Sequence, residues 1–145
     1  MGNRTFDEPY SNLEDSLRVE RKREAVRELC YGLKGIRNIK EYFGGLGYMA
    51  ETLLKVFPKS HILCQEISDK CLLALRHRLP ISRVKVKHQD FFNDCETLKY
   101  DLITLDWNTF TLLQYRKNKP LQQAIKRVLS CQPRCIILND SAINK

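Results

Sequence analysis

Apolar and polar positions along this chain form short blocks whose period alternates between that of β-strands and that of α-helices. Strand-like apolar runs fall at residues 39–43, 60–67, 83–89, 100–106 and 134–138. Helix-like spacing of apolar residues falls between them, at residues 48–57, 69–79 and 120–129. This alternation predicts an α/β fold in which helices cover both faces of a mostly parallel sheet. In the run at 83–89 valine alternates with lysine, so we expect a half-exposed or edge strand.

Residues 1–35 are expected to form an irregular arm and one basic helix, ahead of a core at 36–145. Ser11 and Glu14 have the spacing of a capping box, and Gly32 and Gly35 are placed to end the helix. The apolar stripe expected to face the core consists of Ala25, Val26, Leu29, Cys30 and Leu33. The opposite face carries the densest basic cluster of the chain: Arg18, Arg21, Lys22, Arg23 and Arg27.

Three glycines, Gly44, Gly45 and Gly47, separate the first strand from the helix that follows it. Glycine adopts positive φ in a tight turn, and without a Cβ it lets a ligand lie against the backbone. The next helix then points its N–H groups at the bound group. This arrangement is typical of the opening of a βαβ nucleotide-binding unit, although a plain tight turn is the alternative.

Polar residues follow the later strands at the end where open parallel sheets bind ligands. Glu66 ends the second strand about 20 residues after the glycine turn, where a carboxylate can accept from two ribose hydroxyls. After the third strand, Asp90 can accept from an exocyclic amine and Phe91 can cover an adenine face. The fourth strand ends in Asp106, and Asn108 follows it.

Taken together, residues 36–138 resemble the class I S-adenosylmethionine-dependent methyltransferases. Residues 41–47 match the family's first motif, except that Phe43 stands where its first glycine usually stands, which is expected to narrow the methionine end of the pocket. Residues 65–68, 89–91 and 101–106 match the second, third and fourth motifs. The resemblance implies a Rossmann-like doubly wound sheet and S-adenosylmethionine as cofactor. It assigns cofactor binding to Glu41, Phe43, Gly45, Gly47, Glu66, Ile67, Asp90 and Phe91.

Three features bear on that resemblance. A nicotinamide dinucleotide fold, the nearest competitor, would prefer G-x-G-x-x-G, and the turn at 44–47 lacks that spacing. About five strands are predicted, without the antiparallel C-terminal hairpin of the family. After the fourth strand neither the proline-containing turn of amino methylation nor a Pro-Cys nucleophile occurs, so Asp106 and Asn108 are the predicted substrate-side residues.

The chain has 145 residues and a formal net charge of +8, with an isoelectric point near 9.3. This charge favours a polyanionic partner, and we predict nucleic acid, bound through the basic cluster of the first helix. A solvated basic surface is the alternative. No apolar run approaches the about 20 residues of a membrane span. Six scattered cysteines without zinc-ligand spacing indicate buried free thiols in a reducing compartment, and therefore a cytoplasmic protein without a metal site.

The resulting prediction is an S-adenosylmethionine-dependent methyltransferase that acts on nucleic acid. The alternative is a catalytically inactive methyltransferase-like module, viral or mobile-element in style, that binds nucleic acid or a protein. A small-molecule methyltransferase is disfavoured by the charge. The apolar strand at 134–138 would be an unprotected edge, so we expect it to be covered by a second copy, by a partner or by residues 1–35.

Overall fold

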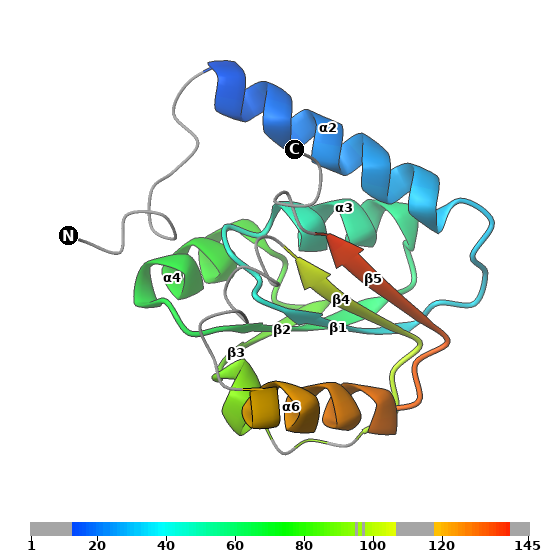
Figure 1. Ribbon diagram of the computed structural model, residues 1–145. Helices are drawn as coiled ribbons and strands as arrows, with labels where there is room; N and C mark the ends of the chain where they lie inside the picture. Colours follow the sequence, from blue (N-terminus) through cyan, green and yellow to red (C-terminus); the bar gives the residue numbers. More distant parts are fainter. Residues whose placement is uncertain (1–12, 95, 97, 107–117, 140–145) are drawn as a thin grey trace.

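The computed structural model describes residues 13–94, 96, 98–106 and 118–139, and its five strands form one parallel sheet (Figure 1). The strand order is β3-β2-β1-β4-β5, so the direction of winding reverses between β1 and β4. The strands are β1 Asn38–Tyr42, β2 His61–Glu66, β3 Val84–His88, β4 Leu102–Asp106 and β5 Cys135–Asn139. Each strand begins and ends within two residues of its predicted run, and β3 is at an edge as predicted.

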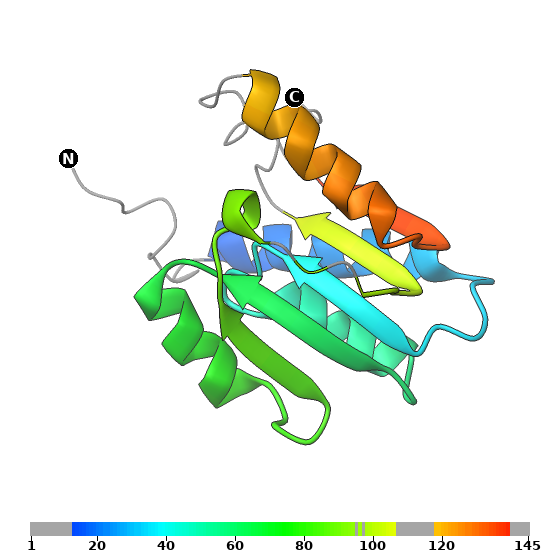
Figure 2. The same ribbon diagram turned by 90° about the horizontal axis from the view of Figure 1, so that it is seen from below.

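Helices lie on both faces of the sheet, which confirms the doubly wound α/β arrangement (Figures 1 and 2). Three helices share one face, α6 lies on the other, and a short 3-10 helix, η1, follows β3. They are α2 Leu13–Cys30, α3 Tyr48–Val56, α4 Asp69–Arg78, η1 Phe91–Asn93 and α6 Asn118–Ser130. None of the described helices is long and apolar enough to cross a membrane.

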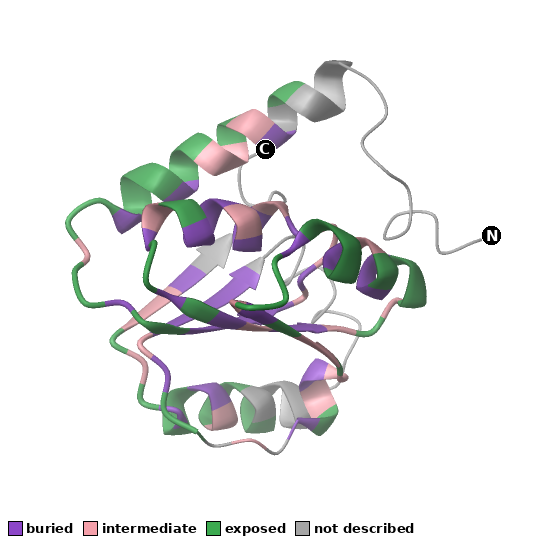
Figure 3. Cartoon of the chain, turned by 180° about the vertical axis from the view of Figure 1, so that it is seen from behind, coloured by how far each residue is buried: buried purple, intermediate pink, exposed green. Residues whose placement is uncertain are grey.

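Alternation along the strands divides the core into two layers. Ile39 of β1 faces α2, α3 and α4, in a cluster that includes Leu53 and Leu75. Tyr42, on the other face of β1, belongs to the cluster that Val128 of α6 completes. Figure 3 shows the buried residues concentrated along the sheet and on the sides of the helices that face it. The sheet thus fixes β1 at the centre, with its carboxyl end between the two layers.

The apolar stripe of α2 differs from the predicted one. Val19, Val26 and Cys30 are buried, whereas Ala25 is exposed and Leu29 is 60 % exposed. The reason is that α2 packs mainly against α3, so only a narrow line of its surface is covered. The predicted cap Ser11 lies outside the described residues.

The N-terminal helix shares its core with the sheet. Val26 and Cys30 belong to the same apolar cluster as Ile39. A boundary near residue 35 therefore stays a prediction. The prediction of buried thiols holds for Cys30, Cys64, Cys71 and Cys131, which are free and buried, while Cys135 is half-buried.

The edge at β5 pairs with β4 alone among the described strands. Residues 13–35 do not add a strand to it, since α2 packs on α3. Ile137 of β5 is nevertheless buried in the core. Cover by a second copy or a partner stays a prediction.

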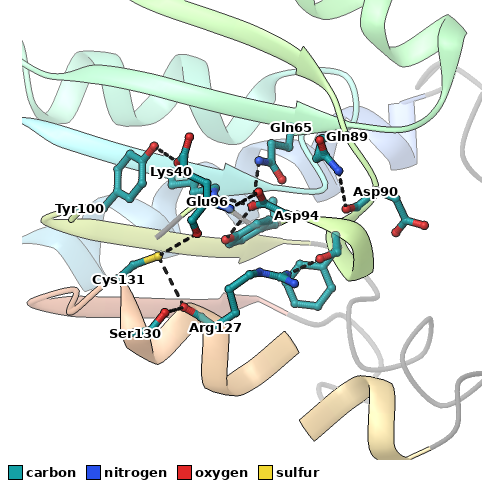
Figure 4. Close-up of polar contacts among 12 residues, drawn as sticks. Lys40, Gln65, Gln89, Asp90, Asp94, Glu96, Tyr100, Arg127, Ser130 and Cys131 are labelled. Carbon is teal, nitrogen blue, oxygen red and sulfur yellow. Dashed lines mark hydrogen bonds and ion pairs between the residues drawn. The ribbon is translucent and has the colours of Figure 1, made fainter. Parts of the chain in front are cut away.

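Buried charges lie beneath β1 on the α6 face (Figure 4). Lys40 is fully buried, and its Nζ lies 2.6 Å from Asp94 Oδ2 and 3.2 Å from Glu96 Oε1. The Tyr100 hydroxyl donates to Glu96, and the Lys40 ammonium lies 4.9 Å from the ring centroid of Tyr42. A buried ammonium is tolerated only with such partners, so these contacts fasten the segment after η1 to the sheet.

The titration of both partners reflects this pairing. Burial by itself would lower the pKa of Lys40, but the hydrogen bond to Asp94 and the neighbouring charges raise the pKa above its usual value. Burial would raise the pKa of Asp94, but hydrogen bonds from Lys40, from the Glu96 backbone and from Gln65 bring the pKa below its usual value. Both shifts favour the charged forms in the folded protein.

We predict that the free energy of unfolding falls as pH drops below about 4, the usual pKa of an aspartate. Asp94 has a lower pKa in the folded state, so its stabilisation is present above the unfolded pKa and is lost as pH falls through the folded one. The raised pKa of Lys40 adds a loss at the alkaline end, as pH rises through its folded pKa.

Calorimetric melting across the acid range checks this prediction. Asp94→Asn should lower stability at neutral pH and flatten the acid dependence, whereas Glu28→Gln, on the exposed surface of α2, should keep the wild-type slope. An acid slope unchanged in Asp94→Asn would assign the dependence to other carboxylates.

Candidate functional site

A small cavity of about 30 Å³ lies at the carboxyl ends of β1, β2 and β3. Five of its lining residues are predicted cofactor ligands: Phe43, Glu66, Ile67, Asp90 and Phe91. Three further residues line it that the predicted set lacks: Tyr42, Gln65 and Gln89. The structure thus brings together residues from three strand ends beside the point where the strand order reverses, which is where open α/β sheets bind ligands.

The turn after β1 has a backbone that explains its glycines. Gly45 and Gly47 have φ of 57° and 93°, in the region that glycine adopts most readily. Phe43 stands at the position where the methyltransferase family that the sequence resembles uses glycine. Its φ of 60° places it in the left-handed region. For a residue with a Cβ that conformation costs roughly 1–2 kcal/mol.

Glu66 connects this turn to the start of α4. Its carboxylate accepts hydrogen bonds from the backbone N–H of Gly45 at 2.7 Å, of Ile67 at 2.9 Å and of Ser68 at 3.2 Å. An ionised carboxylate offers about four acceptor positions, so one remains for a ligand hydroxyl. Engaging both hydroxyls of a ribose would require Glu66 to release one of these N–H groups.

Aromatic rings form one wall of the cavity. Phe91 packs edge-on against Tyr42, with ring centroids 4.9 Å apart, and its centroid lies 5.2 Å from that of Phe43. Asp90 is the N-cap of η1, and its side chain accepts from the Phe92 N–H at 3.0 Å. The Phe43 ring therefore packs against the ring that we predict to cover adenine.

The remaining predicted ligands do not line the cavity. Glu41 is fully buried in β1, with its Oε1 3.8 Å from the Cys64 thiol. Gly45 and Gly47 shape the turn but are not among the lining residues. Asp106 ends β4, next to β1, but its side chain lies outside the described residues, as does all of Asn108. The roles predicted for Asp106 and Asn108 stay predictions.

Tyr42, Gln65 and Gln89 were missed because their neighbours are distant in sequence. Alternation does place Tyr42 and Gln65 on the same face of adjacent strands. Which loop would cover that face cannot be read from periodicity. The signal that could have found Gln65 is an amide within a buried strand, where apolar residues are usual.

The predicted basic cluster on α2 is partly neutralised. Arg23 lies 3.2 Å from Glu20 and 3.4 Å from Glu51, and Arg27 lies 3.3 Å from Glu20. The hydrogen bonds from both arginines lower the pKa of the Glu20 carboxyl. Arg21 is exposed, and the side chain of Arg18 lies outside the described residues.

Among the residues that the structure describes, no group of three or more histidine, cysteine, aspartate or glutamate side chains is placed to hold a metal ion.

The closest packing in the turn is at Gly44. Its N–H donates to the Gln65 carbonyl at 2.9 Å, and a Cβ added there would lie 2.3 Å from Cys64 Sγ. We therefore expect Gly44→Ala to lower the free energy of unfolding by about 1–3 kcal/mol in urea titrations, because the methyl group overpacks the core. The cost should be smaller in a Cys64→Ala background, where the obstructing sulfur is absent.

Gly32→Ala is the matched control for this prediction. Gly32 has φ of 85° and nothing within 4 Å of the added Cβ, so the substitution strains the backbone without a clash. Its cost should be the same with or without Cys64. Equal coupling of Cys64 to both glycine positions would contradict the packing argument.

The fold is shared with solved methyltransferases. The chain matches an amino pentose methyltransferase of calicheamicin biosynthesis from Micromonospora echinaspora with a TM-score of 0.62 and 19% identity, over 82% of this chain and 52% of that one. It matches the N-methyltransferase NodS from Bradyrhizobium japonicum with a TM-score of 0.61 and 14% identity, over 77% and 55% of the two chains. For the mitomycin 7-O-methyltransferase MmcR the TM-score is 0.66 and the identity 15%, over 88% and 37%.

Two further comparisons find no relative: no protein-family model and no curated protein matches the sequence. The chain spans about half or less of the length of the solved structures named above. The likeness is therefore one of fold, which in this chain is a parallel sheet with helices on both faces. On these features the chain has the fold of the class I S-adenosylmethionine-dependent methyltransferases.

Proposed function

We propose that the chain binds S-adenosylmethionine at the carboxyl ends of β1, β2 and β3 and acts as a methyltransferase. The observation that carries this proposal is the position of Glu66. Its carboxylate is fixed at the end of β2 against the glycine turn, beside a cavity lined by Asp90 and Phe91. A ribose acceptor, an amine acceptor and an aromatic face in one cavity suit an adenosyl group.

The residues have separable roles in this proposal. Glu66 holds the ribose, Asp90 accepts from the adenine amine, and Phe91 covers the base. The cofactor supplies an electrophilic methyl group on its sulfonium, and the protein contributes by orienting it toward the acceptor. Asp106 and Asn108 remain the residues that we predict on the acceptor side.

The cavity fits the polar groups of an adenosyl moiety but not its volume. A space of about 30 Å³ is far smaller than a typical ligand pocket of about 300–1,000 Å³. Displacement of the Phe43 ring would enlarge the cavity, because this ring lines the cavity and lies against Phe91. Binding therefore includes a movement of Phe43 away from Phe91.

The class of methyl acceptor is a separate question. The net charge of +8 favours a polyanion, and nucleic acid is our predicted acceptor on that ground. Arg23 and Arg27 are engaged by glutamates, which reduces the charge that α2 offers to phosphates. The solved methyltransferases named above carry names of small-molecule reactions, so a small-molecule acceptor is the competing proposal.

A second function is favoured by Phe43 itself. A bulky residue at a glycine position, over a cavity of this size, suits a methyltransferase-like module that has lost cofactor binding and serves as a binding protein. The two functions differ in one measurable property, which is affinity for the cofactor.

Calorimetric titration of the chain with S-adenosylmethionine and S-adenosylhomocysteine separates them. We expect both to bind, and Glu66→Ala to weaken binding by about 1–3 kcal/mol through loss of a charge-assisted hydrogen bond. Glu24→Ala, on the exposed side of α2, should bind as the wild type does. No binding by the wild-type chain would support the inactive module, and equal binding by Glu66→Ala would remove the ribose assignment.

The small size of the cavity leads to a prediction about Phe43. Phe43→Gly should bind S-adenosylhomocysteine about three- to tenfold more tightly, because the binding-competent open state is then more populated. Calorimetry measures the change. The control is Phe92→Ala, which removes a ring that packs 5.3 Å from Phe91 without lining the cavity, and which should not tighten binding. Weaker binding by Phe43→Gly would make Phe43 a ligand contact rather than a cover.

A further inference from the structure

We infer that Gln65 is a specificity residue of the cavity, whose side-chain oxygen accepts a hydrogen bond from the exocyclic amine of a bound adenine. This inference rests on the proposed cofactor function and names a residue that is not among the predicted cofactor ligands. Gln65 is the fifth residue of β2, it is 1% exposed, and it lines the cavity together with Asp90 and Phe91.

The amide of Gln65 is satisfied on one side only. Its Nε2 donates to Asp94 Oδ2 at 3.1 Å, whereas its Oε1 is buried and has no hydrogen-bond partner among the described residues. A buried acceptor left without a donor is destabilising, and native cores rarely retain one. An unpartnered acceptor in the lining of a cavity is explained when a ligand N–H completes it.

Contacts on the α6 face of the sheet fix the orientation of the Gln65 amide. The same Asp94 oxygen accepts from Lys40 Nζ at 2.6 Å and lies 3.4 Å from the Tyr42 hydroxyl. Because the Asp94 side chain is ionised and 1 % exposed, the donor side of the Gln65 amide must face it. The reversed amide would bring Oε1 against a carboxylate. Figure 4 shows Gln65 turned with its nitrogen toward Asp94.

The pairing with Asp90 makes the cavity selective for an amino group. An exocyclic amine carries two hydrogens, and two residues with side-chain acceptors line the cavity, Asp90 after β3 and Gln65 of β2. A purine that lacks the amine leaves Gln65 Oε1 buried and unpaired. A site built to bond a ligand N–H rejects the analogue that lacks it more strongly than an apolar pocket would.

The test compares S-adenosylhomocysteine with its analogue in which hydrogen replaces the exocyclic amine, both titrated calorimetrically into the full chain. The wild type should prefer S-adenosylhomocysteine by at least about tenfold, the value of one to two hydrogen bonds. Gln65→Met, which keeps the length of the side chain and removes its acceptor, should reduce that preference by about three- to tenfold. The surface substitution Gln122→Met should leave the preference unchanged.

Asp94→Asn provides a second variant that leaves Gln65 in place. An amide at position 94 can donate to Gln65 Oε1, which frees the Gln65 amide to turn, so the preference for the amine should narrow as in Gln65→Met. Equal binding of the two ligands by the wild type overturns the inference and leaves cofactor binding intact. A preference that persists unchanged in a folded Gln65→Met also overturns it. Failure of the wild type to bind either ligand overturns the proposed function as well.

Discussion

The cavity depends on the ion pairs that the buried Lys40 ammonium makes. Lys40 lies on the central strand, and its carboxylate partners Asp94 and Glu96 belong to the segment that follows η1. Because a buried charge cannot be left unpaired, this segment has one position relative to the sheet. That position places η1, and the Phe91 ring with it, edge-on against Tyr42. The ion pairs of Lys40 therefore fix the cavity wall that Phe91 forms. They lie on the α6 face of β1, whereas α3, the helix after the glycine turn, lies on the other face.

The glycine turn and the Glu66 carboxylate form a second, complementary unit. Glu66 accepts from N–H groups that precede and follow β2 in the sequence. One belongs to the glycine turn, and two lie just before α4. The carboxylate thereby compensates for backbone donors that the turn and the helix start leave open. A residue that would bind a ribose also holds the turn in shape, so the shape of the turn and the state of the site are coupled.

Periodicity predicted the elements because apolar spacing changes between strands and helices, and because glycine or proline marks several junctions, such as the turn at 44–47, Pro58 and Pro80. It also placed Glu66, Asp90 and Phe91 at strand ends, and the structure brings these three to one cavity. Periodicity could not predict that Lys40 is buried, since the two carboxylates that allow the lysine to be buried are 54 and 56 residues away in the sequence. Leu29 shows the same limit: it is apolar and helical, yet exposed, because the crossing of α2 over α3 decides which stripe is covered.

The Cys64 thiol lies beneath the glycine turn, and its reactivity depends on whether that turn is open. Cys64 is fully buried directly under Gly44, and burial together with the nearby Glu41 carboxylate raises its pKa well above the usual value. Burial likewise raises the pKa of Cys30, to about 11. Thiols of this kind react with alkylating reagents only when the structure around them opens. The alkylation rate of Cys64 would therefore time the opening of the glycine turn, while that of Cys30 times the release of α2.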